Sequence, residues 1–86
     1  MSTGVGAVSK DDVAQLVRRI LEERSINAAV LPESDLRDVG LTSLDMVALV
    51  LSVEAEFNLT LPEIQITPAN FRSISAINAL VISLRG

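Results

Sequence analysis

The sequence lacks the side chains that most catalytic and metal-binding sites require. Its 86 residues include no His and no Cys, so an imidazole base, a thiolate and the commonest metal ligand are absent. The carboxylates match no calcium-loop spacing. A catalytic serine would need a neighbouring base, and the only lysine, Lys10, lies on a different predicted helix from Ser43. We therefore expect neither an enzyme nor a metal site.

Ser43 is one of nine serines in the sequence, and a neighbouring residue can take over the capping role that its position suggests. A serine at a helix start is usually an N-cap, and that interpretation stays open. In Gly40-Leu41-Thr42-Ser43-Leu44-Asp45, however, Thr42 and Asp45 already satisfy the Ser/Thr-x-x-acid capping pattern. The Ser43 hydroxyl would then project from the first helical position, where another enzyme could modify it. A phosphate attached there would lie near the positive end of the helix dipole.

Apolar residues at three- and four-residue steps predict the helices that would position Ser43. One helix is expected over residues 10–24, opened by a capping box of Ser9 and Asp12, and a second over residues 43–57. Residues 25–42 have no sustained period, yet they carry several apolar anchors. Since long loops in compact domains tend to be functional or disordered, we expect this connection to be ordered over the helices.

Two further helix starts are predicted towards the C-terminus. Thr67 before Pro68 is a favoured helix start, although Arg72 and Ser73 follow so soon that it allows only one or two turns. Ser73 then caps a last helix that ends at Gly86. The predicted fold is all-α, a bundle of three main helices and one short helix, with a long ordered loop between the first and second helices.

Composition predicts one domain. Hydrophobic residues make up 49% of the chain and aromatics only 2%, which is typical of helices packed through aliphatic side chains. Residues 1–8 are small and aperiodic, so they predict a disordered tail, and residues 9–86 predict a single domain. Met1 followed by such a tail favours a free-standing protein, which we expect to be a monomer.

The charge distribution excludes some partners. The net charge is −4, and seven acids against one base within residues 33–63 give that segment −6. We expect basic protein partners, and neither nucleic acid nor an anionic membrane. No apolar run approaches the roughly 20 residues that cross a bilayer, and no secretory signal is visible. A cytoplasmic protein is therefore predicted.

Residues 38–57, DVGLTSLDMVALVLSVEAEF, resemble the phosphopantetheine attachment region of acyl and peptidyl carrier proteins. In that family a Gly-x-[Asp/His/Thr]-Ser-[Leu/Ile] segment opens the second helix and an acidic-aromatic pair closes it. Asn58-Leu59-Thr60-Leu61-Pro62 resembles the link that follows. The similarity spans residues 9–85.

The resemblance implies a function. Ser43 would receive a 4'-phosphopantetheine arm from coenzyme A through a phosphopantetheinyl transferase. The arm would hold an acyl or aminoacyl group as a thioester. Other partners would be a loading ligase or transferase and downstream condensing or tailoring enzymes. The residues expected to contact partners are Leu44, Asp45, Met46, Leu51 and Glu54, whereas Val47 and Val50 are expected mainly inside.

Two departures from the family pattern bear on the pathway. Fatty-acid carriers often have Asp before the serine, where this chain has Thr42, and Ala48 and Ala55 occupy positions that are commonly acidic. A more apolar recognition helix favours partner binding through apolar contacts over electrostatic attraction that depends on salt concentration. A specialised pathway with an amino-acid, polyketide or modified acyl cargo is therefore expected. The alternative is an unmodified helical interaction domain, in which Ser43 only caps its helix.

Overall fold

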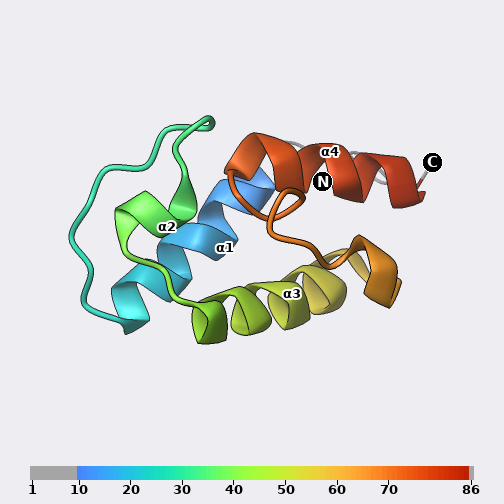
Figure 1. Ribbon diagram of the computed structural model, residues 1–86, viewed down its shortest axis with the longest axis horizontal. Helices are drawn as coiled ribbons and strands as arrows, with labels where there is room; N and C mark the ends of the chain where they lie inside the picture. Colours follow the sequence, from blue (N-terminus) through green and yellow to red (C-terminus); the bar gives the residue numbers. More distant parts are fainter. Residues whose placement is uncertain (1–9, 86) are drawn as a thin grey trace, which may run out of the picture.

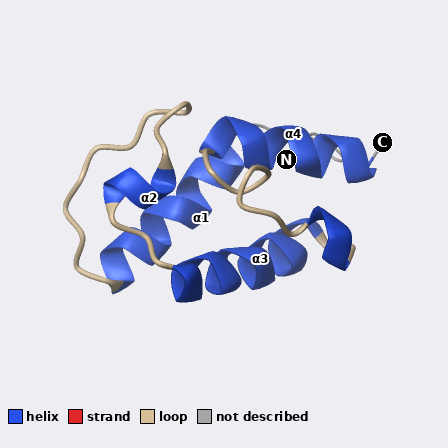
Figure 2. Ribbon diagram, in the orientation of Figure 1, coloured by secondary structure: helices blue, strands red, loops and turns tan. Residues whose placement is uncertain are grey.

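Four α-helices and one 3₁₀ turn form the fold over residues 10–85, the part of the chain that the computed structural model describes (Figure 1). No strand occurs within these residues (Figure 2). The elements follow the chain as α1 (Lys10–Glu23), α2 (Leu36–Val39), α3 (Ser43–Phe57), the 3₁₀ turn η1 (Glu63–Gln65) and α4 (Ile74–Arg85). The predicted all-α class is confirmed. The predicted tail of residues 1–8 and the Ser9 cap lie outside the described residues.

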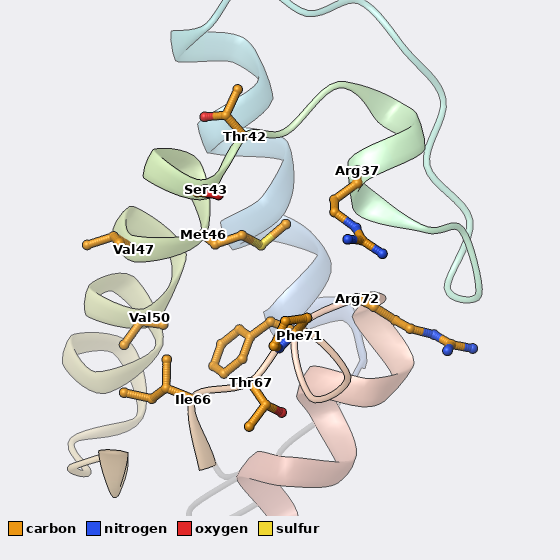
Figure 3. Close-up of a pocket in the computed structure, with 11 residues that line it drawn as sticks. Arg37, Thr42, Ser43, Met46, Val47, Val50, Ile66, Thr67, Phe71 and Arg72 are labelled. Carbon is orange, nitrogen blue, oxygen red and sulfur yellow. The ribbon is translucent and has the colours of Figure 1, made fainter. Parts of the chain in front are cut away.

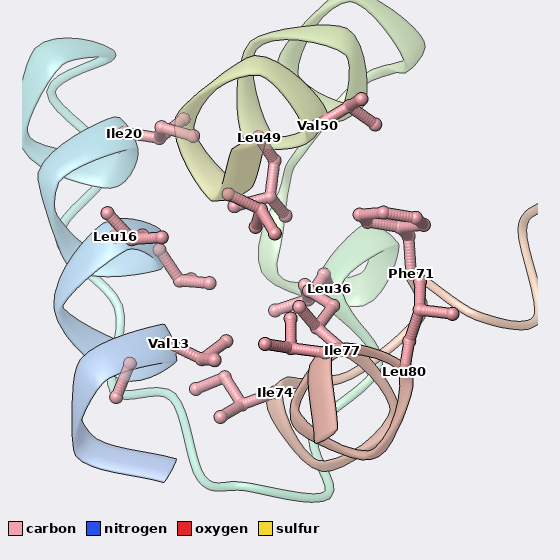
Figure 4. Close-up of a cluster of buried hydrophobic side chains, with 14 of the residues drawn as sticks. Val13, Leu16, Ile20, Leu36, Leu49, Val50, Phe71, Ile74, Ile77 and Leu80 are labelled. Atoms are coloured by element: carbon pink, nitrogen blue, oxygen red, sulfur yellow. The ribbon is translucent and has the colours of Figure 1, made fainter. Parts of the chain in front are cut away.

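Helix α1 forms the centre of the bundle because it packs against both α3 and α4. Its apolar stripe faces a core in which Leu49 of α3 and Ile77 of α4 are fully buried (Figure 4). Leu36 of α2 is also fully buried in this core. One aliphatic cluster therefore fixes all four helices relative to one another.

The long connection between α1 and α3 is ordered, as predicted, and it contains the short helix α2. The Leu36 amide donates to the Arg72 carbonyl at 2.8 Å, and the Ser75 amide donates to the Pro32 carbonyl at 3.0 Å. These bonds tie the connection to α4 and to the segment before it. Gly40 ends α2 at φ +122°, a conformation that side chains disfavour, and thereby turns the chain into α3.

The short helix predicted at Thr67 and Pro68 is reduced to one turn. The Phe71 amide donates to the Thr67 carbonyl at 3.2 Å, and the Asn70 amide donates to Thr67 Oγ1 at 3.2 Å. The turn stops there because Ser73 is the cap of α4, with its Oγ accepting from the Ala76 amide at 3.0 Å. The regular 3₁₀ turn lies earlier, at η1.

If α2 belongs to the core, Leu36→Ala should lower the free energy of unfolding by about 2–5 kcal/mol, because it leaves a cavity under a fully buried side chain. Leu31→Ala is the matched control, since Leu31 lies in the same connection and is 68% exposed. Its effect should stay within about 0.5 kcal/mol. Urea unfolding followed by circular dichroism measures both, and equal small effects would contradict a packed connection.

Candidate functional site

The N-terminus of α3 is closed by the predicted capping box. Thr42 is the N-cap, and its Oγ1 accepts from the Asp45 amide at 3.3 Å. In return, Oδ2 of Asp45 accepts from the Thr42 amide at 2.8 Å and from the Thr42 hydroxyl at 3.0 Å. Two amides that the helix start would leave unpaired are thus satisfied. This first turn is held without any contribution from Ser43.

Ser43 is the first residue of α3, and its side chain is exposed. Within residues 10–85 its hydroxyl has no hydrogen-bond partner. Since neither capping nor packing uses this hydroxyl, the interpretation of Ser43 as an N-cap is wrong. A free hydroxyl at the positive end of a 15-residue helix is a suitable place to attach an anionic group.

Asp45 was expected to contact partner proteins, but its side chain is buried. Its side chain is only 7% exposed, and Nη1 of Arg24 lies 2.6 Å from its Oδ1. The hydrogen bond from the Thr42 amide, followed by the hydrogen bond and charge of Arg24, lowers the pKa of the Asp45 carboxyl below its ordinary value of 3.8 against the opposing effect of burial. The contact between Arg24 and Asp45 was not among the predictions from the sequence. No local pattern links these two residues, which are 21 positions apart.

Glu54 also makes a hydrogen bond within the fold, since its Oε2 accepts from the Leu61 amide at 2.8 Å. This bond holds the link after α3 against the helix. Its side chain is half-buried, so only part of it is available to a partner.

A cleft of about 240 Å³ opens beside Ser43 between α3 and the chain before α4. Figure 3 shows Met46 extending from α3 across the opening, with Phe71 and Ile66 on the opposite side. Arg37 reaches towards the same opening from α2 (Figure 3). The full lining is Arg37, Thr42, Ser43, Met46, Val47, Val50, Ile66, Thr67, Pro68, Phe71 and Arg72. The cleft therefore has apolar walls and one guanidinium group, that of Arg37, at its edge, because the Arg72 side chain extends away from the opening (Figure 3).

The outer face of α3 carries an exposed apolar stripe, which we define as Leu44, Val47 and Leu51. Their exposed fractions are 80%, 56% and 60%. The expectation that Val47 is inside is wrong, whereas Val50 is buried as expected. The reason is helical phase: residues 44, 47 and 51 share one face, opposite the buried face that contains Leu49.

Within residues 10–85 no cluster of three or more potential ligand side chains could hold a metal ion. The same residues form no helix of sufficient length and apolarity to span a bilayer.

Comparison with known proteins agrees with this geometry. Residues 11–81 match the family described as "Phosphopantetheine attachment site". The chain is 49% identical over 74 residues to Aminoacyl carrier protein 2 of Bradyrhizobium diazoefficiens, covering 86% of this chain and 83% of that protein. It is 46% identical over 74 residues to Aminoacyl carrier protein 1 of the same organism, covering 86% and 82%.

Solved structures give the same result. One is the crystal structure of Bradyrhizobium japonicum glycine:[carrier protein] ligase complexed with cognate carrier protein and an analogue of glycyl adenylate. It matches with a TM-score of 0.74 and 46% identity over 86% of this chain and 96% of that chain. The ligase complexed with glycylated carrier protein matches with a TM-score of 0.72 and 46% identity over 83% and 96%.

The fold and the free serine at the start of α3 define a carrier domain, which bears its cargo on a covalent group. The chain belongs to the phosphopantetheine-binding carrier protein family. The predicted family, the carrier function and the 4'-phosphopantetheine cofactor are thereby confirmed. Carriers of this family are generally not catalytic.

The lowered pKa of Asp45 predicts a pH-dependent stability. Its ionised form stabilises the folded state at neutral pH, and this contribution is lost as the pH falls from 3.8 through the lower folded pKa. Asp45→Asn should therefore cost about 2 kcal/mol at pH 7 and less at pH 3, as measured by urea unfolding. Glu56→Gln, at an exposed residue of the last turn of α3, is the control and should change little at either pH. A cost for Asp45→Asn that is equal at both pH values would contradict this role.

Proposed function

We propose that Ser43 is the residue to which a phosphopantetheinyl transferase attaches the arm. The observation that carries the proposal is the exposed hydroxyl of Ser43 at the first position of a helix that Thr42 already caps. Its Oγ would attack the phosphorus joined to pantetheine in coenzyme A, and adenosine 3',5'-bisphosphate would leave. The hydroxyl proton would pass to a base of the transferase, because this chain has no His to accept it.

The surroundings of Ser43 fit an attached phosphodiester. The positive dipole end of α3 favours an anion at this position. The Arg37 guanidinium group, which reaches towards the adjacent cleft (Figure 3), adds a positive charge beside this position. When attached, the arm supplies a thiol that holds the cargo as a thioester, while the residues of this chain position the arm and its partners.

We further propose that the cargo is an amino acid, with glycine as the first candidate. The proposal is supported by the similarity to two aminoacyl carrier proteins and to carriers in complex with a glycine:[carrier protein] ligase. The apolar walls of the cleft and the Arg37 guanidinium group at its edge disfavour an ammonium group inside it, since burying a charge is unfavourable and like charges repel. We therefore expect the aminoacyl group to remain in solvent, accessible to partner enzymes.

The apolar stripe of α3 is the proposed docking surface for the loading ligase, the transferase and downstream condensing or tailoring enzymes. Leu44 and Leu51 belong to it, with Val47 added by the structure. No charged residue lies within the stripe itself, so docking should depend on apolar burial and respond little to salt. Met46, which lines the cleft, and Glu54, which is half-exposed, lie next to this surface and are proposed to contact partners as well. Asp45 is buried, so its proposed role is to hold the first turn of α3 in place.

We place the carrier in the cytoplasm as a monomer that is not itself an enzyme. The absence of His and Cys from the sequence supports a role confined to carriage. Its partners then supply the bases, while the nucleophiles on the carrier are the Ser43 hydroxyl and, once the arm is attached, the thiol of the arm.

The attachment is tested by incubating the purified chain with coenzyme A and a broad-specificity phosphopantetheinyl transferase, followed by intact-mass and peptide mass spectrometry. One phosphopantetheine should be added at Ser43 and none to Ser43→Ala. Ser52→Ala, on the same helix, is the control and should be modified normally. Because the Ser43 hydroxyl supports no contact, Ser43→Ala should alter the free energy of unfolding by less than about 0.5 kcal/mol. An unmodified wild-type chain, with several transferases tried, would instead favour the unmodified interaction domain.

The docking surface is tested by Leu51→Glu, which places a charge in the stripe. It should raise the KM of a glycine:[carrier protein] ligase for the holo carrier about tenfold or more, because a charge at the centre of an apolar contact loses its solvation. Ile82→Glu is the matched control, since Ile82 is 50% exposed on α4, away from Ser43. Equal KM values for the two variants would contradict the proposed surface.

A further inference from the structure

Arg24 joins two helix ends that meet beside Ser43. It follows the last residue of α1, and its amide still donates to the Ile20 carbonyl at 3.0 Å. Its guanidinium group contacts Asp45 in the first turn of α3. A cation at a helix C-terminus and an anion at a helix N-terminus each complement the local dipole. The pair therefore connects two ends at which both of its charges are favoured.

The Asp45 carboxylate links Arg24 to Thr42, the residue before Ser43. Arg24 Nη1 lies 2.6 Å from Asp45 Oδ1, while Oδ2 of the same carboxylate accepts from the Thr42 amide at 2.8 Å. Ser43 lies between Thr42 and Asp45 in sequence, so both ends of the short segment that contains it are held by one carboxylate. That carboxylate is buried, whereas Arg24 is 45% exposed. Removing the arginine would leave a buried negative charge without its cationic partner.

The backbone around Arg24 is itself anchored. The Ser25 amide donates to the Glu22 carbonyl at 3.0 Å, and the Ile26 amide donates to the Leu21 carbonyl at 2.8 Å. Ile26 packs beside Gly40, where its Cδ1 would lie 3.5 Å from an added Cβ. The end of α1 thus contacts the turn into α3 on two sides, through Ile26 and through Arg24.

We propose that Arg24 is a positioning residue for the modification of Ser43, and this inference rests on the proposed function. Through Asp45 it keeps the first turn of α3 in the conformation that a phosphopantetheinyl transferase binds. Arg24 does not contact the Ser43 hydroxyl, and it does not set the direction in which that hydroxyl attacks coenzyme A. If only a fraction of the carrier has this conformation, the apparent affinity falls by that fraction. Loss of Arg24 should therefore act on KM and leave kcat unchanged.

The test compares Arg24→Gln with Arg19→Gln, which removes the same charge from an exposed position of α1. Initial rates of phosphopantetheine transfer at varied carrier concentration should give Arg24→Gln a KM about three- to tenfold above wild type, with kcat changed by less than about twofold. Arg19→Gln should match wild type. Amide hydrogen exchange on the apo proteins should be faster at Asp45 in Arg24→Gln and unchanged at the core residue Leu49.

Arg24→Lys provides the rescue. Because the single nitrogen Nη1 contacts both carboxylate oxygens, an ammonium group can replace it without a guanidinium fork. This variant should recover most of the KM and of the exchange protection at Asp45.

The inference is overturned if KM is unchanged in Arg24→Gln, if Arg19→Gln raises KM equally, or if lysine fails to rescue. Faster exchange at Asp45 and Leu49 alike would also overturn it, because the effect would then be global destabilisation. In each of these results wild type is modified at Ser43, so the proposed function stands. If wild type itself stays unmodified, the proposed function fails and the inference falls with it.

Discussion

The carboxylate of Asp45 is the constraint on which the site depends. One of its oxygens accepts from the Thr42 amide and hydroxyl, and both oxygens accept from Arg24. Burial would disfavour this charge, but the donors around it lower the pKa of the carboxyl. Because one side chain both caps α3 and ties it to α1, the hydroxyl of Ser43 is left free and held in place. Asp45, which was expected to contact partners, is thus a buried residue that holds the first turn of α3 in place.

The sequence lacks the side chains that would activate Ser43, so we assign the chemistry at Ser43 to partner enzymes. Without His or Cys the chain lacks the bases that most often activate a serine, and the contribution that we propose for it is position and recognition. The apolar stripe of α3 lies on the exposed face of the helix, and the cleft with Arg37 lies beside Ser43. The core of aliphatic side chains keeps both features on a rigid helix. A small bundle can therefore serve several enzymes in turn without changing its own chemistry.

Local sequence patterns predicted the local structure well. The spacing of Thr42 and Asp45 predicts a capping box whose bonds form within three residues, and apolar periodicity predicts α1 and α3. Non-local packing was not predictable. The Arg24 contact spans 21 residues, and the exposure of Val47 depends on which face of α3 meets α1. The turn at Thr67 was shortened by the cap that α4 needs at Ser73.

We propose that Ser43 carries an arm that presents an aminoacyl thioester. The most direct measurement incubates apo and holo chains with glycine, ATP and a glycine:[carrier protein] ligase, then follows intact mass before and after mild hydroxylamine. We expect one glycyl group on the holo chain, released by hydroxylamine, and none on the apo chain or on Ser43→Ala. Equal labelling of the apo chain, or a glycyl group that resists hydroxylamine, would contradict it.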